Sequence, residues 1–243
     1  MAIAFSGLTH PGRLRDNNED AWQVEPDLCL AVLADGMGGH QCGEVGSALT
    51  IDGVISYFRQ PPEDLAPEQL VKEAVRHANR QVLDAAKARP ECGNMGSTVV
   101  LAHWSARDLI VGNVGDSRAY LCRDGRLVQL SHDQNVAAEL RTRLGFTEEQ
   151  IQRVPDRNAL TMAVGSVEHV LVLTHGETLQ DGDEVLLCSD GLHGPVGDAM
   201  IREVLAASCT LREKAQKLVD CANAVGGPDN ITVVLLEYRT DGL

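Results

Sequence analysis

Residues 28–47 read LCLAVLADGMGGHQCGEVGS, an apolar run that passes directly into a glycine-rich stretch. The first seven residues are typical of a buried β-strand. Glycine is less favourable than alanine inside a helix or strand by roughly 0.5–1 kcal/mol, so the glycines in 36–43 indicate a backbone with a special path. Two interpretations fit this stretch: a loop of tight turns, or a site where the Asp35 carboxylate and the main chain approach a charged ligand.

The length and composition predict one globular domain over residues 1–243. The apolar fraction of 44% and the charged fraction of 23% are ordinary for a folded domain with a substantial core. The longest apolar run has seven residues, far below the roughly 20 that cross a bilayer. The N-terminus has no basic segment ahead of a long apolar one, so we expect no secretory signal, a cytoplasmic location and no membrane partner.

The net charge is −14, from 21 basic and 35 acidic residues. This charge disfavours nucleic acid as a partner, because its phosphates are neutralised by Lys and Arg. An acidic excess is typical of a solvated surface, and it also arises where carboxylates converge on cations.

Seven cysteines occur, an odd number, and none forms a C-x-x-C pair. This pattern supports neither a disulfide framework nor a zinc site. Cys42 is the only cysteine that we expect to be reactive, since it lies in the glycine-rich loop.

The periodicity predicts more strands than helices. Strands are expected at 28–34, 97–104, 108–114, 117–123, 126–131, 183–189 and 231–238. Helices are expected at 44–58, 67–87 and after Thr210, with a short one in 147–153. Because Asp124-Gly125 suits a type I′ hairpin, and hairpins join antiparallel neighbours, we expect antiparallel sheet with helices on the outer faces.

Four aspartates lie at the ends of predicted strands: Asp35, Asp116, Asp190 and Asp229. Strand ends in one sheet system share a rim, so these carboxylates can converge there. Convergent carboxylates repel one another, and divalent cations relieve that repulsion. The ligands on offer are oxygens, which favours Mg²⁺ or Mn²⁺ over Zn²⁺.

Arg15 precedes Glu19 and Asp20 in the stretch GRLRDNNEDAW. A guanidinium near these acids is either a plain salt bridge or a fork that binds phosphate oxygens. A binuclear metal centre with an arginine fork is suited to hydrolysis of a phosphate ester.

The sequence resembles the metal-dependent protein serine/threonine phosphatases of the PPM (PP2C-type) family in their compact bacterial form. The resemblance extends from about residue 7 to residue 238. It rests on the stretches GRLRDNNEDAW, LAVLADGMGGHQCGEVGS, MGSTVVLA, VGNVGDSRAYL, LSHDQ, RNALTMAVG, DEVLLCSDGL and GGPDNITVVLLE, which occur in the family's order.

The resemblance implies an α+β fold: a four-layer α-β-β-α sandwich with two central antiparallel sheets and the metal centre at one end. It implies that Asp35 bridges two Mn²⁺ or Mg²⁺ ions and that the Gly36 carbonyl binds one of them. The other roles that it implies are metal ligation by Asp190 and Asp229, third-metal binding by Asp116, contacts to metal-bound water by Glu19 and Asp20, phosphate binding by Arg15, and positioning of the 229 loop by Asn230. Residues 140–160 correspond to the family's flap.

The implied reaction is direct attack of metal-activated water on phosphoserine or phosphothreonine. In the eukaryotic pattern a histidine follows the Asp-Gly pair as general acid, but Met37 stands there in this chain. His40 is a possible substitute, as is a metal-bound water.

We expect phosphoproteins as substrates, a bacterial Ser/Thr kinase and its targets as partners, and a monomer. The alternative function is a catalytically weak pseudophosphatase that binds phosphoproteins. Loss of a metal aspartate would indicate that alternative, and all four expected aspartates are present.

Overall fold

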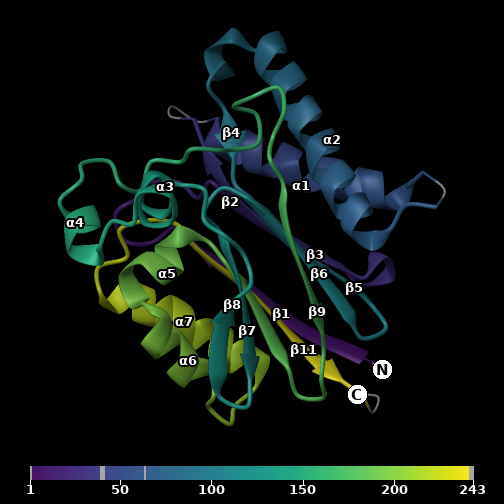
Figure 1. Cartoon of the computed structure of the whole chain (residues 1–243), viewed down its shortest axis with the longest axis vertical. Helices are drawn as coiled ribbons and strands as arrows, with labels where there is room; N and C mark the ends of the chain where they lie inside the picture. Colours follow the sequence, from purple (N-terminus) through teal and green to yellow (C-terminus); the bar gives the residue numbers. More distant parts are fainter. Residues whose placement is uncertain (1, 39–41, 63, 241–243) are drawn as a thin grey trace.

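Two antiparallel β-sheets pack face to face, and helices cover the outer face of each (Figure 1). The computed structural model describes residues 2–38, 42–62 and 64–240. This four-layer arrangement confirms the predicted α+β sandwich.

The first sheet has the strand order β1-β11-β10-β7-β8. Its strands are β1 (Ala2–His10), β11 (Ile231–Arg239), β10 (Glu184–Cys188), β7 (Arg118–Arg123) and β8 (Arg126–Gln129). The second sheet has the order β2-β3-β5-β6-β9, with the short β4 paired to β3. Its strands are β2 (Asp20–Glu25), β3 (Leu30–Met37), β4 (Gly96–Ser97), β5 (Val99–Ser105), β6 (Asp108–Val114) and β9 (Leu173–Thr178).

Helices α1 (Gly43–Arg59) and α2 (Pro67–Ala88) cover the second sheet. Helices α5 (Asp190–Val196), α6 (Asp198–Leu205) and α7 (Leu211–Ala224) cover the first. Two further helices, α3 (Val136–Leu144) and α4 (Glu148–Gln152), lie beside α5 at one end of the sandwich (Figure 1). Short 3₁₀ turns occur at η1 (Pro26–Leu28) and η2 (Pro90–Cys92).

Strand β3 is buried on both faces, which explains its continuous apolar run. Leu33 points into the core between the two sheets, whereas Leu30 and Val32 point into the core under α1 and α2. A strand in such a position cannot show the alternation of apolar and polar residues that marks a half-buried strand.

The predicted hairpin turn and the predicted helices after Thr210 and in 147–153 are confirmed. Asp124 and Gly125 have φ values of 51° and 72°, as a type I′ hairpin requires. Thr147 and Thr210 each form a capping box with the residue three positions on. Strands β1, β2 and β9 and helices α3, α5 and α6 were not predicted.

The expectation of no disulfide is wrong for one pair. Cys42 and Cys92 are joined, with their Cα atoms 5.5 Å apart and a separation of 50 positions in the sequence. The bond joins the residue before α1 to the end of η2, a contact that no local spacing of cysteines can show.

Candidate metal centre

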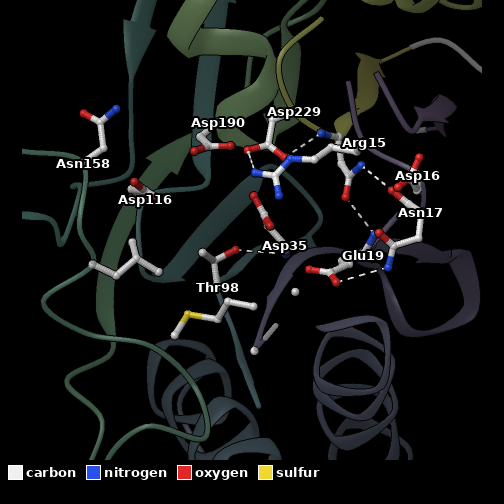
Figure 2. A pocket seen from close by; sticks show the side chains of 15 residues that line it. Arg15, Asp16, Asn17, Glu19, Asp35, Thr98, Asp116, Asn158, Asp190 and Asp229 are labelled. Atoms are coloured by element: carbon white, nitrogen blue, oxygen red, sulfur yellow. Dashed lines mark hydrogen bonds and ion pairs between the residues drawn. The ribbon is translucent and has the colours of Figure 1, made fainter. Parts of the chain in front are cut away.

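A cleft of about 780 Å³ opens at the end of the sandwich where several strands finish. Its lining includes Asp35, Asp116, Asp190 and Asp229, so the structure brings together the four aspartates singled out from the sequence. Figure 2 shows the side chains of Asp35, Asp190 and Asp229 turned toward one another. We call this the acidic cleft. It is lined by Arg15, Asp16, Asn17, Glu19, Asp35, Gly36, Met37, Gly38, Thr98, Asp116, Asn158, Leu160, Asp190, Asp229 and Asn230.

The backbone of Asp35 is held by the start of the neighbouring strands. Its N–H donates to Thr98 Oγ1 at 3.0 Å, and its carbonyl accepts from Thr98 N at 2.8 Å and from Ser97 Oγ at 2.9 Å. Thr98 Oγ1 also bonds to Ser117 Oγ at 2.7 Å. These bonds give Ser97, Thr98 and Ser117 structural roles, and they fix where the Asp35 carboxylate emerges.

Gly36 lies where three backbone segments meet. A Cβ atom at this position would lie 2.1 Å from the Gly43 carbonyl oxygen and 2.6 Å from the Glu19 carbonyl oxygen. The Gly36 N–H donates to that same Glu19 carbonyl at 3.1 Å. The structure therefore explains this glycine by the close approach of α1 and the Glu19 backbone, a reason that the sequence did not suggest.

Asp190 is the first residue of α5, directly after the end of β10. Gly191 allows α5 to begin there, because a Cβ at 191 would lie 1.9 Å from the Asn230 carbonyl oxygen. Asn230 also joins the loop ahead of β2: its Nδ2 donates to the carbonyls of Pro11 and Asn17 at 2.9 Å each, and its Oδ1 accepts from Glu19 N at 2.8 Å. Asn230 thus connects the Asp229 turn to the segment that carries Glu19.

Arg15 forms an ion pair with Asp229 rather than with the acids near it in the sequence. Its Nη2 donates to Asp229 Oδ2 at 2.8 Å, and the two side chains are 52% and 35% exposed. The sequence left open whether Arg15 forms a plain salt bridge or a fork that binds phosphate oxygens, and the structure answers only the first question. The salt bridge exists, and it holds the guanidinium in the acidic cleft (Figure 2).

Glu19 and Asp20 face different surroundings. Glu19 lines the acidic cleft, where Asn17 Nδ2 donates to its Oε1 at 3.2 Å. Asp20 is paired in register with Asp35 on the adjacent strand and is buried behind the cleft. Its Oδ2 accepts from Thr232 Oγ1 at 2.6 Å and from Ser189 Oγ at 2.8 Å, while its Oδ1 has no hydrogen-bond partner in the described part of the chain.

Four buried aspartates of this region have pKa values above those of free carboxyls. Burial, followed by the charges of Asp20 and Asp190, raises the pKa of Asp35 well above its ordinary value. Burial also raises the pKa of Asp190, with the Asp229 charge as the next cause. Burial raises the pKa of Asp20 to about 6, and burial together with the Asp190 charge raises the pKa of Asp116 to about 7. Such a cluster is unfavourable when fully ionised and favours cations.

The donor set fits hard divalent cations. Within the described residues, no three His, Cys, Asp or Glu side chains form a cage that could hold an ion by themselves. Mg²⁺ and Mn²⁺ do not need one, since Mg²⁺ usually keeps several waters and binds one or two carboxylates. Buried carboxylates with raised pKa values and the unpartnered Oδ1 of Asp20 are the observations that support the fit.

Some residues of this region were not predicted from the sequence. Asp16, Asn17 and Asn158 line the acidic cleft, and no pattern in the sequence distinguished them. His193 Nε2 donates to the Asp116 carbonyl at 3.0 Å, and burial lowers the pKa of this histidine to about 4. His40 lies outside the described residues.

The segment predicted to be the flap, 140–160, contains the end of α3 and all of α4. Its residues Asn158 and Leu160 line the acidic cleft. Just before it, Asn135 Nδ2 donates to Asp116 Oδ2 at 3.1 Å. The segment therefore borders the cleft on the Asp116 side.

The chain belongs to the protein phosphatase 2C family, whose model matches residues 13–226. It is 33% identical over 235 residues to the serine/threonine phosphatase stp of Listeria monocytogenes, covering 94% of this chain and 93% of that protein. It is 35% identical over 238 residues to the serine/threonine protein phosphatase PstP of Mycobacterium tuberculosis, covering 98% of this chain and 45% of that protein.

Solved structures of bacterial phosphatases share the fold. The crystal structure of the M. tuberculosis phosphatase PstP/Ppp matches with a TM-score of 0.90 at 32% identity, covering 98% of this chain and 100% of that one. The catalytic domain of PstP in complex with two manganese ions matches with a TM-score of 0.86 at 32% identity, covering 98% of each chain. No helix in the described ranges is long and apolar enough to cross a bilayer.

Proposed function

We propose that this chain is a metal-dependent protein phosphatase that hydrolyses phosphoserine and phosphothreonine in proteins. The observation that carries the proposal is the convergence of Asp35, Asp116, Asp190 and Asp229 with Arg15 in one cleft. The family membership and the named phosphatases among the relatives favour catalysis over the pseudophosphatase alternative.

The residues that would hold the metals are those at the strand ends. Asp35 would contact two Mn²⁺ or Mg²⁺ ions, with the Gly36 carbonyl on one and Asp190 and Asp229 on the other. Asp116 together with Asp190 would hold a third. Such ions lower the pKa of water and neutralise phosphate charge, which is the chemistry that they supply in phosphate ester hydrolysis.

The remaining groups orient what enters the acidic cleft. Arg15 keeps N–H donors beyond the one that binds Asp229, and these would bind phosphate oxygens as a fork. Glu19 would accept hydrogen bonds from water in the acidic cleft. Asp20, which is buried behind Asp35, would also accept a hydrogen bond from water. Asn230 would keep the Arg15 and Glu19 segment in register with Asp229, because its side chain accepts from Glu19 N–H and its own N–H donates to the Asp229 carboxylate.

The leaving seryl or threonyl oxygen needs a proton. Met37 lines the acidic cleft and has no proton to give. His40, or a water molecule bound to a metal, would serve as the general acid.

The biological setting follows from this activity. Phosphoproteins would be the substrates, and a bacterial Ser/Thr kinase would act on the same targets in the opposite direction. We propose one domain over 1–243 acting as a monomer in the cytoplasm, with residues 140–160 as a flap that shapes substrate access.

The test compares Asp35→Asn with Asp52→Asn, a change at an exposed acid on α1 away from the acidic cleft. With excess Mn²⁺, the unaltered protein and Asp52→Asn should hydrolyse p-nitrophenyl phosphate and a phosphothreonine peptide equally well. Asp35→Asn should lose roughly 10²–10³-fold in kcat, the loss typical when one group that stabilises transition-state charge is removed. Equal activity of the two variants would contradict the proposal, and a chelator that left the activity unchanged would contradict its metal dependence.

A further inference from the structure

Cys42 and Cys92 form the disulfide of the described part of the chain, and neither lines the acidic cleft. Cys42 is the residue immediately before α1, and Cys92 is the last residue of η2. Both are almost fully buried, at 4% and 7% exposure, in the core under α1 and α2. The other cysteines, Cys29, Cys122, Cys188, Cys209 and Cys221, are free thiols.

The segment that begins at Cys42 directly contacts the end of β3, which carries Asp35 and Gly36. The Gly43 carbonyl oxygen lies against Gly36, and a Cβ on Gly43 would lie 2.3 Å from Glu19 Oε2. Ser47 Oγ, one turn further along α1, donates to the Glu19 carbonyl at 2.5 Å. The start of α1 therefore sets the position of both Gly36 and Glu19.

The segment that follows Cys92 contacts the same strand from another side. Strand β4 pairs with the end of β3, with Gly36 opposite Ser97 and Met37 opposite Gly96. Gly46 of α1 lies against β4, because a Cβ there would be 2.5 Å from the Gly96 carbonyl oxygen. The disulfide thus ties together the two segments between which the end of β3 lies.

We propose that Cys42 and Cys92 are a reversible thiol–disulfide modification site that controls the affinity of the acidic cleft for divalent cations. In the disulfide form, the residue before α1 is covalently joined to the end of η2, four residues ahead of β4, so the start of α1 and β4 hold Gly36 and Asp35 in place. In the dithiol form only packing and hydrogen bonds hold the start of α1 and β4 together, so the backbone at Gly36 has more conformational entropy. A cation that binds must then order this backbone. Ordering on binding then weakens the affinity.

The oxidant that fits the buried pair is a small one, hydrogen peroxide. One thiolate attacks a peroxide oxygen, the O–O bond breaks, and a sulfenic acid forms with release of hydroxide, which takes up a proton to give water. The second thiolate attacks the sulfenic sulfur, the S–S bond forms, and a second water leaves. Two thiols and one peroxide therefore give one disulfide and two waters. A small dithiol reverses the step by two exchanges, in which it becomes oxidised itself.

The inference rests on the proposed metal site, so the experiment measures cation binding and activity separately. Mn²⁺ binding is measured by calorimetry on the protein oxidised with peroxide and on the protein reduced with a phosphine, which are distinguished by mass spectrometry of the intact chain. We expect the reduced form to bind Mn²⁺ at least about fivefold more weakly, the lower end of typical coupling between two sites. Re-oxidation should restore the affinity.

Cys92→Ser provides the variant and Cys209→Ser its matched control at a free cysteine. Cys92→Ser should bind Mn²⁺ as weakly as the reduced protein whatever the oxidant, and Cys209→Ser should respond to redox state as the unaltered protein does. Equal Mn²⁺ affinity of the oxidised and reduced forms would overturn this inference while leaving the phosphatase proposal intact. Absence of Mn²⁺ binding in both forms would overturn the proposed metal site, and with it this inference. A mass spectrum with no Cys42–Cys92 link after peroxide treatment would also overturn it.

Discussion

Binding of Mn²⁺ to the metal-free protein should release protons, and more at pH 6 than at pH 8. Burial raises the pKa of Asp116 to about 7 and that of Asp20 to about 6, with the Asp190 charge adding to both and hydrogen bonds opposing the shift. Carboxylates near a cation must be ionised, so a cation that enters the acidic cleft displaces the protons that these groups carry.

The magnitude follows from the two pKa values. At pH 6 a carboxyl with a pKa of 7 is about 0.9 protonated and one with a pKa of 6 is about 0.5 protonated, together about 1.4 protons. At pH 8 the same two groups carry only about 0.1 proton, so the release should fall by about 1.3 protons between these pH values. Burial and neighbouring charges also raise the pKa of Asp35 well above its ordinary value, so Asp35 adds to the release.

Calorimetry in pairs of buffers with low and high ionisation enthalpy counts these protons directly. Asp116→Asn removes one titrating group without changing its size, and it should lower the release at pH 6 by about 0.9 proton. If the release were the same at pH 6 and pH 8, or if the variant released as many protons as the unaltered protein, the assignment of these carboxyls to the cation site would be refuted.

Three further predictions follow from the same region. When folding raises the pKa of a carboxyl, the folded protein loses stability as the pH rises from the unfolded pKa to the folded pKa. The Tm of the metal-free protein should therefore be lower at pH 7.5 than at pH 5, and Mn²⁺ should raise the Tm more at pH 7.5. Scanning calorimetry checks both predictions. Arg15→Ala should lower kcat/KM by roughly 10²-fold through lost phosphate contacts. The Mn²⁺ affinity should not fall, because Asp229 loses a competing ion pair. An equal loss of kcat/KM and of Mn²⁺ affinity would contradict the phosphate-binding role of Arg15. Gly36→Ala should abolish most Mn²⁺ binding in calorimetry, because the added Cβ would collide with the Gly43 carbonyl. The control Gly176→Ala, whose added Cβ would make only an ordinary contact at 3.5 Å, should bind Mn²⁺ normally. Similar Mn²⁺ affinities of the two variants would refute the packing argument.

The parts of the fold that could be predicted are those that local sequence determines. Strand β6 was predicted with its observed bounds, 108–114, and β11 ends one residue beyond its predicted end. Both are rich in β-branched and apolar residues and end at turns, so nearby residues are sufficient to identify them.

The missed elements depend on contacts between distant residues. Strand β1 pairs over its whole length with β11, from Ala2 opposite Arg239 to His10 opposite Ile231, and nothing near it in the sequence indicates this partner. Helix α5 has the sequence DGLHGPV, with two glycines and a proline that disfavour a helix. Tertiary packing, with Leu192 fully buried and Gly191 against Asn230, stabilises it instead.

The candidate site divides in the same way. The acids at strand ends could be found because each lies close to one end of an apolar run, and the structure brings them into one cleft. The partner of Arg15 could not, since proximity in the sequence suggested Glu19 and Asp20, whereas the ion pair is formed with Asp229, which is 214 positions away. Sequence distance is a poor guide to charge pairing where loops from opposite ends of a chain meet.

The glycine-rich stretch has a consequence for how binding and folding are connected. Gly36, Gly43 and Gly46 each lie where a Cβ would collide, respectively with the Gly43 carbonyl, the Glu19 carboxylate and the Gly96 carbonyl. The Gly43 carbonyl in the first turn of α1 therefore packs directly on the backbone of Gly36, the residue after Asp35. Any change that moves the start of α1 must move the end of β3 as well, so substitutions in this turn should alter the affinity of the proposed cation site although they touch no cation.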